Sequence, residues 1–170
     1  MLVLVASRPD TFHIERSTLI AARSETVFAL VNDFGAWRKW SPYEKVDPNM
    51  KRTYGGAPSG VGATYAWVGN DQIGEGRMTI EKSDPAKLIV IELQFIKPFP
   101  ATNTATFRFT PTAGGATQVT WSMDGENSFL SKAFQLVMDF DGLVGADFEH
   151  GLAAMKTSAE EARNARSELR

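Results

Sequence analysis

Residues 144–166, VGADFEHGLAAMKTSAEEARNAR, carry the pattern that decides the fold. Five apolar residues recur at steps of four, three, four and three: Phe148, Leu152, Met155, Ala159 and Ala162. This spacing places one apolar stripe along one side of an α-helix, while charged residues such as Glu149 and Lys156 lie off it. A single long helix needs a broad apolar surface to cover its stripe, and a curved β-sheet would provide one.

Gly151 lies on or beside this stripe, where glycine costs about 1 kcal/mol of helix stability relative to alanine. A glycine in such a place has a packing or a functional reason. It lets the helix pack closely on the sheet, or its missing side chain leaves room for a ligand. We expect close packing, and room for a ligand stays open as the alternative.

The sequence before this helix reads as short strands separated by turns. Alternation of apolar and polar residues predicts a first strand over residues 11–21 and a short one over 50–54, followed by a loop at 55–60. The same pattern predicts further strands over residues 61–68, 74–82, 88–95 and 104–110, and a last strand from which Val119, Trp121 and Met123 face inward. This order predicts an α+β fold, in which an antiparallel sheet has one face on the helix and the other in water.

Two short helices are expected after the first strand. Ser24 is a plausible N-cap for the first of them. Its buried side consists of three apolar residues: Val27, Phe28 and Val31. The second is a single helical turn that carries Trp37 and Trp40 and ends at the following Ser-Pro pair.

A further helix is expected between the last strand and the long helix. Ser128 can cap it, and it would run over residues 129–140. Asp141-Gly142 would then separate it from the long helix. We expect the long helix to begin between Leu143 and Asp147 and to run for at least four turns.

The chain has 170 residues, enough for one domain with a real core, and we place that domain at residues 10–166. The composition is ordinary for a globular protein, at 43% hydrophobic and 22% charged, with a net charge of -2. Such a charge offers no basic field for a phosphate backbone, so nucleic acid is a poor candidate partner. The sequence contains no cysteine, which excludes thiol nucleophiles, disulfides and thiolate metal sites.

Residues 1–9 are expected to lie outside the core, as a disordered segment or the remnant of a longer leader. The apolar run MLVLVA is too short to span a bilayer and lacks the basic start of a signal peptide. We therefore expect a cytoplasmic protein, or a membrane-anchored or exported one if a hydrophobic leader precedes this sequence. Deleting residues 1–7 should leave the melting temperature within a few degrees.

The side chains predicted to face inward are aromatic, rich in methionine and almost uncharged. They are Tyr65, Trp67, Met78, Ile80, Leu93, Phe95, Phe107, Phe109, Trp121 and Met123 from the strands, with Phe148, Leu152 and Met155 from the helix. This set forms a plain core, or it lines an apolar cavity between helix and sheet. Tyrosine and tryptophan have polar tips that need partners, methionine adapts to varied shapes, and ligand pockets are mostly apolar.

Two stretches resemble a known family. Residues 28–43, FALVNDFGAWRKWSPY, resemble the signature of polyketide cyclase/dehydrase-type proteins of the START-like (SRPBCC) superfamily, and residues 147–156, DFEHGLAAMK, resemble their C-terminal helix. GEGRM at 74–78 and WSM at 121–123 also fit. The resemblance implies the helix-grip fold, a curved antiparallel sheet wrapped around a long C-terminal helix with a hydrophobic tunnel between them. The superfamily includes lipid carriers, hormone receptors, cyclases, oxygenase domains and co-chaperone-like modules.

Few residues suggest catalysis. His13 and His150 are expected at the surface, and Glu75 and Arg77 on a solvated strand face. No metal-ligand spacing, nucleophile elbow or phosphate loop appears in the sequence. The inward set contains one hydroxyl, that of Tyr65, and two indole N–H groups, so its polarity favours binding over acid–base chemistry.

Trp37, Trp40 and Tyr43 form an aromatic cluster after the first short helix, and it is either a core plug or the rim of a tunnel. We predict that the protein binds or carries a hydrophobic small molecule, without cofactor or metal. The alternatives are an enzyme of the cyclase/dehydratase type and a co-chaperone-like interaction module. The sequence leaves the oligomeric state open. The predicted ligand-binding residues are Trp40, Tyr43, Tyr65, Trp67, Met78, Phe95, Phe107, Trp121, Phe148, Gly151, Leu152 and Met155.

Overall fold

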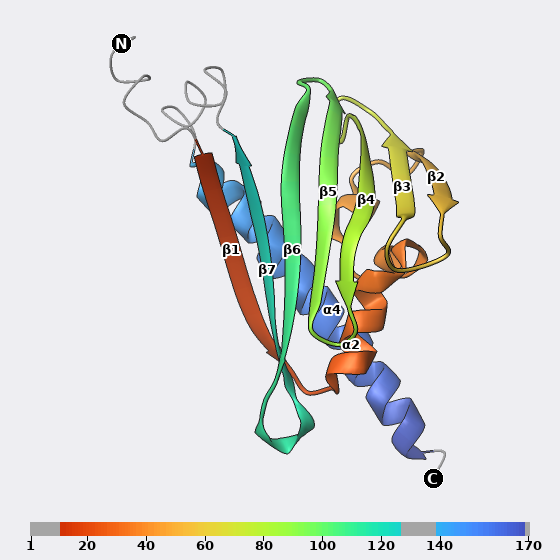
Figure 1. Cartoon of the computed structure of the whole chain (residues 1–170), viewed down its shortest axis with the longest axis vertical. Coiled ribbons are helices and arrows are strands. Elements are labelled where there is room, and N and C mark those ends of the chain that lie inside the picture. The colour runs from red at the N-terminus through yellow and green to blue at the C-terminus, as the bar shows by residue number, and fades with distance from the viewer. Residues whose placement is uncertain (1–10, 127–138, 169–170) are drawn as a thin grey trace.

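The computed structural model describes residues 11–126 and 139–168, and Figure 1 shows its arrangement. Seven segments are strands: β1 (Thr11–Ile20), β2 (Lys51–Gly56), β3 (Ala63–Val68), β4 (Glu75–Asp84), β5 (Leu88–Lys97), β6 (Ala101–Pro111) and β7 (Thr117–Glu126). Two are α-helices: α2 (Ser24–Asn32) and α4 (Phe140–Glu168). Three are short 3-10 helices: η1 (Phe34–Lys39), η2 (Pro42–Lys45) and η3 (Ala113–Gly115).

The strands form one sheet in the order β1-β7-β6-β5-β4-β3-β2, and every neighbouring pair is antiparallel. Strands β2 to β7 follow one another as hairpins, whereas β1 crosses to the far edge and pairs with β7. In that pair Ile20 lies opposite Thr117, and Thr11 lies opposite Glu126. The predicted α+β fold with an antiparallel sheet is confirmed.

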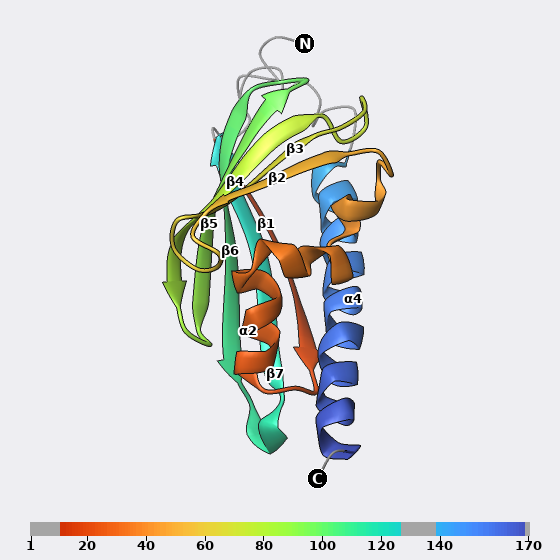
Figure 2. The same ribbon diagram turned by 90° about the vertical axis from the view of Figure 1, so that its right-hand side faces the viewer.

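The sheet curves around the helices, and Figure 2 shows α2 and α4 on its concave side. Helix α4 packs mainly against β1 and α2, with smaller contacts to β7, η1 and η2. Its stripe is buried as predicted over Phe148, Leu152, Met155 and Ala159, each no more than 2% exposed. Ala162 is exposed, so the buried stripe ends one turn earlier than the sequence pattern suggests.

Both helix starts differ from the sequence-based expectation. Ser24 is the first residue of α2 and Arg23 takes the N-cap position, because the Ser24 hydroxyl is 3.1 Å from the Thr117 hydroxyl and is thus used for packing on β7. Helix α4 already includes Asp141-Gly142 and begins at Phe140. Asp139 explains this start, since its carboxylate accepts the Gly142 N–H at 2.9 Å, as an N-cap side chain does. The predicted cap at Ser128 and most of its helix lie outside the described residues.

Strands β2 and β6 extend beyond their predicted bounds in ways that affect the inner face. Strand β2 continues through Gly55 and Gly56, which were expected to be loop, because both pair with β3. Strand β6 begins at Ala101 rather than at Thr104. Asn103 therefore belongs to the sheet and shares the inward face with Ala105, which places a polar side chain on a face predicted to be apolar.

Candidate functional site

The predicted ligand-binding residues separate into two groups on the concave face. The first group surrounds Trp121 on β7. The Trp121 ring stacks on Phe148 of α4, with centroids 3.9 Å apart and planes 9° apart, and on Phe107 of β6 at 5.0 Å. Trp40 meets the Trp121 ring edge-on at 5.6 Å. All four rings are almost fully buried. We call Trp40, Phe107, Trp121 and Phe148 the Trp121 cluster.

Gly151 completes this packing. A Cβ added there would lie 2.9 Å from Cζ3 of Trp121 and 3.0 Å from Cδ of Pro42. The first distance is shorter than real Cβ contacts allow, and the second is tight. The geometry therefore supports the close-packing explanation of this glycine. Leu152 and Met155 follow on the same stripe and are fully buried.

The indole N–H groups of the four tryptophans are not used alike. Three donate to backbone carbonyls: Trp37 to Val31 at 3.0 Å, Trp40 to Leu30 at 2.7 Å and Trp67 to Ile73 at 3.2 Å. The Trp121 N–H is buried and has no acceptor among the described residues. Leaving a buried donor unmatched typically costs about 1–3 kcal/mol, so this group is an exception that needs a physical reason.

Trp37 and Trp40 are part of the core and not of an exposed rim, being 4% and 2% exposed. Their N–H groups bind carbonyls in the last turns of α2, which fixes η1 against the end of that helix. Tyr43 is half-buried and packs against the core. Burial raises the pKa of the Tyr43 phenol, and the negative charge of Asp147 on α4 raises it further.

The second group, Tyr65, Trp67, Met78 and Phe95, lies on β3, β4 and β5. The strand register makes it continuous, because Met78 lies beside both Tyr65 and Leu93, and Gly76 lies beside both Trp67 and Phe95. A Cβ at Gly76 would overlap the Trp67 ring, so the glycine lets this indole lie flat on the sheet. Leu93 and Phe95 remain partly exposed, although they lie on the face that the helices cover elsewhere.

A buried polar cluster borders this second group. Arg52 of β2 donates through Nε to a carboxylate oxygen of Glu44 at 2.6 Å, and the Tyr65 hydroxyl donates to the other oxygen at 2.6 Å. The Glu44 side chain is 6% exposed and that of Arg52 is 16% exposed. Burial raises the pKa of the Tyr65 phenol, and its hydrogen bond to the Glu44 carboxylate raises it further.

Sequence reasoning missed these polar groups, and its inventory of one inward hydroxyl and two indoles was therefore too short. Arg52 could have been found, because it shares the parity of Met50 and Tyr54 in the predicted strand and lies opposite Trp67. Asn103 could also have been found, since it shares the parity of Ala105. Its amide N–H now faces the Met123 sulfur at 3.8 Å. Glu44 lies on η2, a four-residue helix that is too short to show a periodic sequence pattern.

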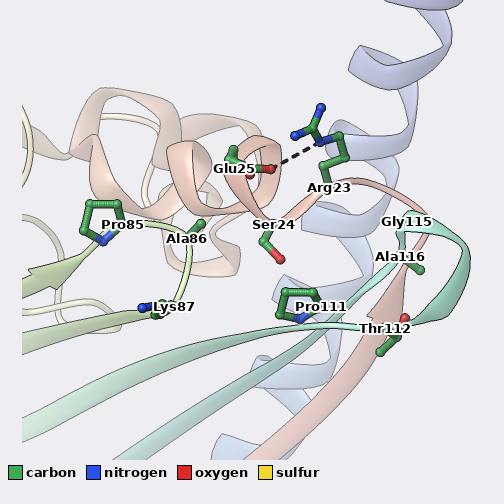
Figure 3. Close-up of a pocket in the computed structure, with 10 residues that line it drawn as sticks. All are labelled: Arg23, Ser24, Glu25, Pro85, Ala86, Lys87, Pro111, Thr112, Gly115 and Ala116. Atoms are coloured by element: carbon green, nitrogen blue, oxygen red, sulfur yellow. Dashed lines mark ion pairs between the residues drawn. The ribbon is translucent and has the colours of Figure 1, made fainter.

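Two surface hollows lie away from both groups. One, of about 280 Å³, lies between the start of α2, the β4–β5 turn and the β6–β7 turn, where Figure 3 shows the Arg23–Glu25 ion pair at its edge. The other, of about 250 Å³, is a groove between α2 and α4. Neither is lined by a residue predicted to bind ligand.

Among the residues that the structure describes, no group of three or more His, Asp or Glu side chains is arranged to hold a metal ion. Within residues 11–126 and 139–168, no helix combines the length and the apolar character needed to cross a membrane. His13 and His150 are both exposed.

Comparison with known protein families identifies the family of this chain. The family described as polyketide cyclase / dehydrase and lipid transport matches residues 11–160. The chain belongs to this family. Comparison of the chain with curated protein sequences finds no match.

Solved structures with the same fold have different names. A START superfamily protein from Mycobacterium smegmatis has a TM-score of 0.64 and 17% identity, over 88% of this chain and 98% of its own. The Zhui aromatase/cyclase from a Streptomyces species has a TM-score of 0.63 and 15% identity, over 88% and 94%. The Aha1 dimer from Colwellia psychrerythraea has a TM-score of 0.60 and 16% identity, over 88% and 96%.

At these identities the likeness shows the fold, which is the START-like helix-grip fold that the family resemblance implied. Family and fold together support a START-type ligand-binding domain. A shared fold hosts many functions, so the ligand and any reaction have to be argued from the side chains.

Proposed function

We propose that this domain binds a hydrophobic small molecule between the sheet and α4, against the inner face of β3 to β6. The observation that carries the proposal is the partial exposure of Leu93 and Phe95 on that face. Large apolar side chains facing the helices would be fully buried if the space beside them were filled by described residues. A ligand that covers them would gain about 25 cal/mol for each Å² of apolar surface removed from water.

The remaining composition of this face suits such a ligand. Met78 and Met123 can adapt to varied shapes, while Trp67 provides a rigid flat surface. Asn103 lies beside Leu93 and supplies an amide with spare hydrogen-bonding capacity. An apolar surface with a few polar groups is the usual composition of a small-molecule site.

The binding test uses N-phenyl-1-naphthylamine, a neutral apolar dye that fluoresces more strongly out of water. We expect saturable binding and a higher melting temperature, with a stabilisation of about 2.7 kcal/mol at a dye concentration 100 times the dissociation constant. Leu93→Glu should abolish binding, because it places a charge on the proposed surface. Leu19→Glu is the matched control, since Leu19 is 50% exposed on the outer face of β1.

The outcomes separate clearly. Loss of dye binding in Leu93→Glu alone, in a protein that still melts cooperatively, supports the site. Equal binding by the two variants would place the dye elsewhere. Absence of saturable binding to the unmodified protein would contradict the proposal. Mass spectrometry of lipophilic material extracted from the purified protein would identify a ligand retained from the host cell.

One observation favours a second candidate, an enzyme that uses acid–base chemistry on a bound hydrophobic molecule. The buried Glu44 carboxylate and the Tyr65 hydroxyl provide a proton acceptor and donor 2.6 Å apart at the edge of the proposed surface. Exchange of the methyl protons of 2-acetylnaphthalene with deuterium, followed by NMR, would test this. Catalysed exchange that is lost in Tyr65→Phe supports the enzyme, and exchange at the rate of buffer alone supports a binding protein.

The interaction-module alternative loses its predicted surface. It depended on an exposed aromatic patch at Trp37 and Trp40, and both rings lie in the core with their N–H groups bound to backbone carbonyls. Trp37 and Trp40 therefore form no exposed aromatic patch.

A further inference from the structure

The orphaned N–H of Trp121 points to a specific role for that residue. Trp37, Trp40 and Trp67 each use the indole N–H inside the protein, and Trp121 has no acceptor for it among the described residues. The stacking of the Trp121 ring on Phe107 and Phe148 does not explain why this residue is a tryptophan. A phenylalanine at position 121 could stack in the same way without burying a hydrogen-bond donor. The donor itself therefore needs an acceptor.

The described contacts of the Trp121 ring, with Phe107, Phe148, Trp40, Gly151 and Pro42, do not supply that acceptor. Phe107 and Phe148 stack against the Trp121 ring, and Gly151 and Pro42 approach it at Cζ3. In an indole, Cζ3 and the N–H lie at opposite ends of the bicyclic ring. The donor therefore lies at the end of the ring that is remote from the contact with Gly151 and Pro42.

Trp121 shares its face of the sheet with the proposed ligand surface. Phe107 lies beside Trp121, and along β6 the same face continues through Ala105 to Asn103, which lies beside Leu93. Ala105 has a small side chain, and its partner Met123 has a flexible one. These residues are buried, so a molecule lying against Leu93 reaches the Trp121 cluster along this row only if the Met123 side chain moves aside.

The chemistry of the acceptor follows from its neighbours. A carboxylate buried among these rings would need a cation to offset its desolvation. Arg16 lies directly opposite Trp121 on β1, and it is already held by Asp141 and Glu149 at 3.0 Å each. A neutral oxygen, such as that of a ketone, needs no such partner.

We propose that Trp121 is a specificity-determining residue whose N–H selects apolar ligands that carry a neutral acceptor oxygen. This inference rests on the proposed function, because it assumes that the ligand lies between the sheet and α4. It adds that a pure hydrocarbon of the same shape binds less well, because it leaves the Trp121 donor without an acceptor.

The test compares two probes of almost identical shape, 2-acetylnaphthalene and 2-isopropenylnaphthalene, by titration calorimetry. They differ in carrying a carbonyl oxygen or a methylene group at the same position. The protein is studied unmodified and with Trp121→β-(3-benzothienyl)alanine, which keeps the bicyclic shape and replaces the N–H by sulfur. The ketone is better hydrated than the hydrocarbon, which affects the ratio of their two dissociation constants in any one protein. This hydration difference cancels when the ratio for the unmodified protein is compared with the ratio for the variant.

We expect the replacement to reduce the preference for the ketone about tenfold, which corresponds to about 1.4 kcal/mol, and to leave the melting temperature unchanged or higher. The same replacement at Trp37 is the matched control, since that N–H binds the Val31 carbonyl. It should lower the melting temperature without changing the ratio. Trp121→Phe, which also lacks the donor, should likewise reduce the preference for the ketone.

Three outcomes would overturn the inference. If both probes bind and the ratio does not change at position 121, the proposed function stands and the role of Trp121 fails. If the replacement at 121 lowers the melting temperature as much as that at 37, the N–H already has a partner within the protein. If neither probe binds the unmodified protein, the proposed function and this inference fail together.

Discussion

Arg16 lies against Gly145, and the contact is so close that a Cβ at position 145 would overlap the guanidinium group. Two carboxylates on α4 hold the arginine there, Asp141 one turn before the glycine and Glu149 one turn after it, each at 3.0 Å. Glycine is unfavourable inside a helix, by about 1 kcal/mol relative to alanine. Its presence here is explained by the arginine that connects β1 to the helix.

Gly145→Ala should therefore destabilise the protein, although alanine is the better helix former. The expected change is a lower free energy of unfolding, because Arg16 must leave its two carboxylates and the added methyl group would overlap the guanidinium group. In Arg16→Ala the same glycine substitution should become stabilising. Urea denaturation of the two single variants and the double variant gives the coupling free energy. Additive effects would show that the contact is unimportant.

Gly151→Ala should also destabilise the protein, by about 1–3 kcal/mol, since its Cβ would press on the Trp121 ring and on Pro42. Binding of N-phenyl-1-naphthylamine should weaken no more than it does in a variant of equal stability with a change elsewhere. A selective loss of binding in a protein of normal stability would instead favour the view that the glycine makes room for a ligand. Thermal denaturation and dye titration distinguish the two explanations.

The ion pair between Glu44 and Arg52 should matter to stability because both side chains are largely buried. Arg52→Met should cost about 3 kcal/mol, since it leaves the Glu44 carboxylate buried without its cation. Adding Glu44→Gln should recover part of this loss. The matched control is Arg23→Met, in an ion pair with Glu25 whose side chains are 79% and 65% exposed, where we expect less than about 1 kcal/mol. Equal losses at the two positions would contradict this account.

Tyr43 and Tyr65 should resist ionisation, because burial raises the pKa of both phenols above the ordinary value of about 10. A phenol that holds its proton more tightly in the folded state contributes stability below that value and loses it as the pH rises toward the folded pKa. The absorbance change at 295 nm up to about pH 11 should be the same in Tyr43→Phe and Tyr65→Phe as in the unmodified protein. A smaller change in either variant would show that its phenol ionises normally.

Much of the fold was predictable because it depends on periodic patterns. The stripe from Phe148 to Ala159 and the alternation in β3 to β7 each extend over several residues, so local exceptions do not hide them. The errors occurred at element ends. Asp139 caps α4 earlier than expected, and Asn103 belongs to a strand that begins at Ala101 and not at the predicted Thr104. Helix caps and strand starts depend on single contacts, and a single contact produces no periodic pattern in the sequence.

The candidate site was less accessible to sequence reasoning. Alternation places Trp67 and Trp121 on the inner face, yet it does not show that the first donates to Ile73 while the second has no acceptor among the described residues. It also treats the face as uniform, whereas α4 covers mainly the β1 side and Leu93 remains half-buried. These differences arise from how the curved sheet meets one straight helix, and a linear pattern does not encode that relation.

The pairing of β1 with β7 has a consequence for how the protein folds. Ser17 and Thr120 face each other across this pair and are 103 residues apart in sequence, whereas Trp37 reaches the end of α2 across six residues. Closing so large a loop lowers the entropy of the chain before the contacts between β1 and β7 can offset that loss. We therefore expect β1 to pair after the hairpins have formed. Stopped-flow measurements on Ile14→Val should show faster unfolding with little change in the folding rate. Ile91→Val, in the central hairpins, should slow folding instead. The strand that comes first in the sequence of this sheet would then be the last to pair.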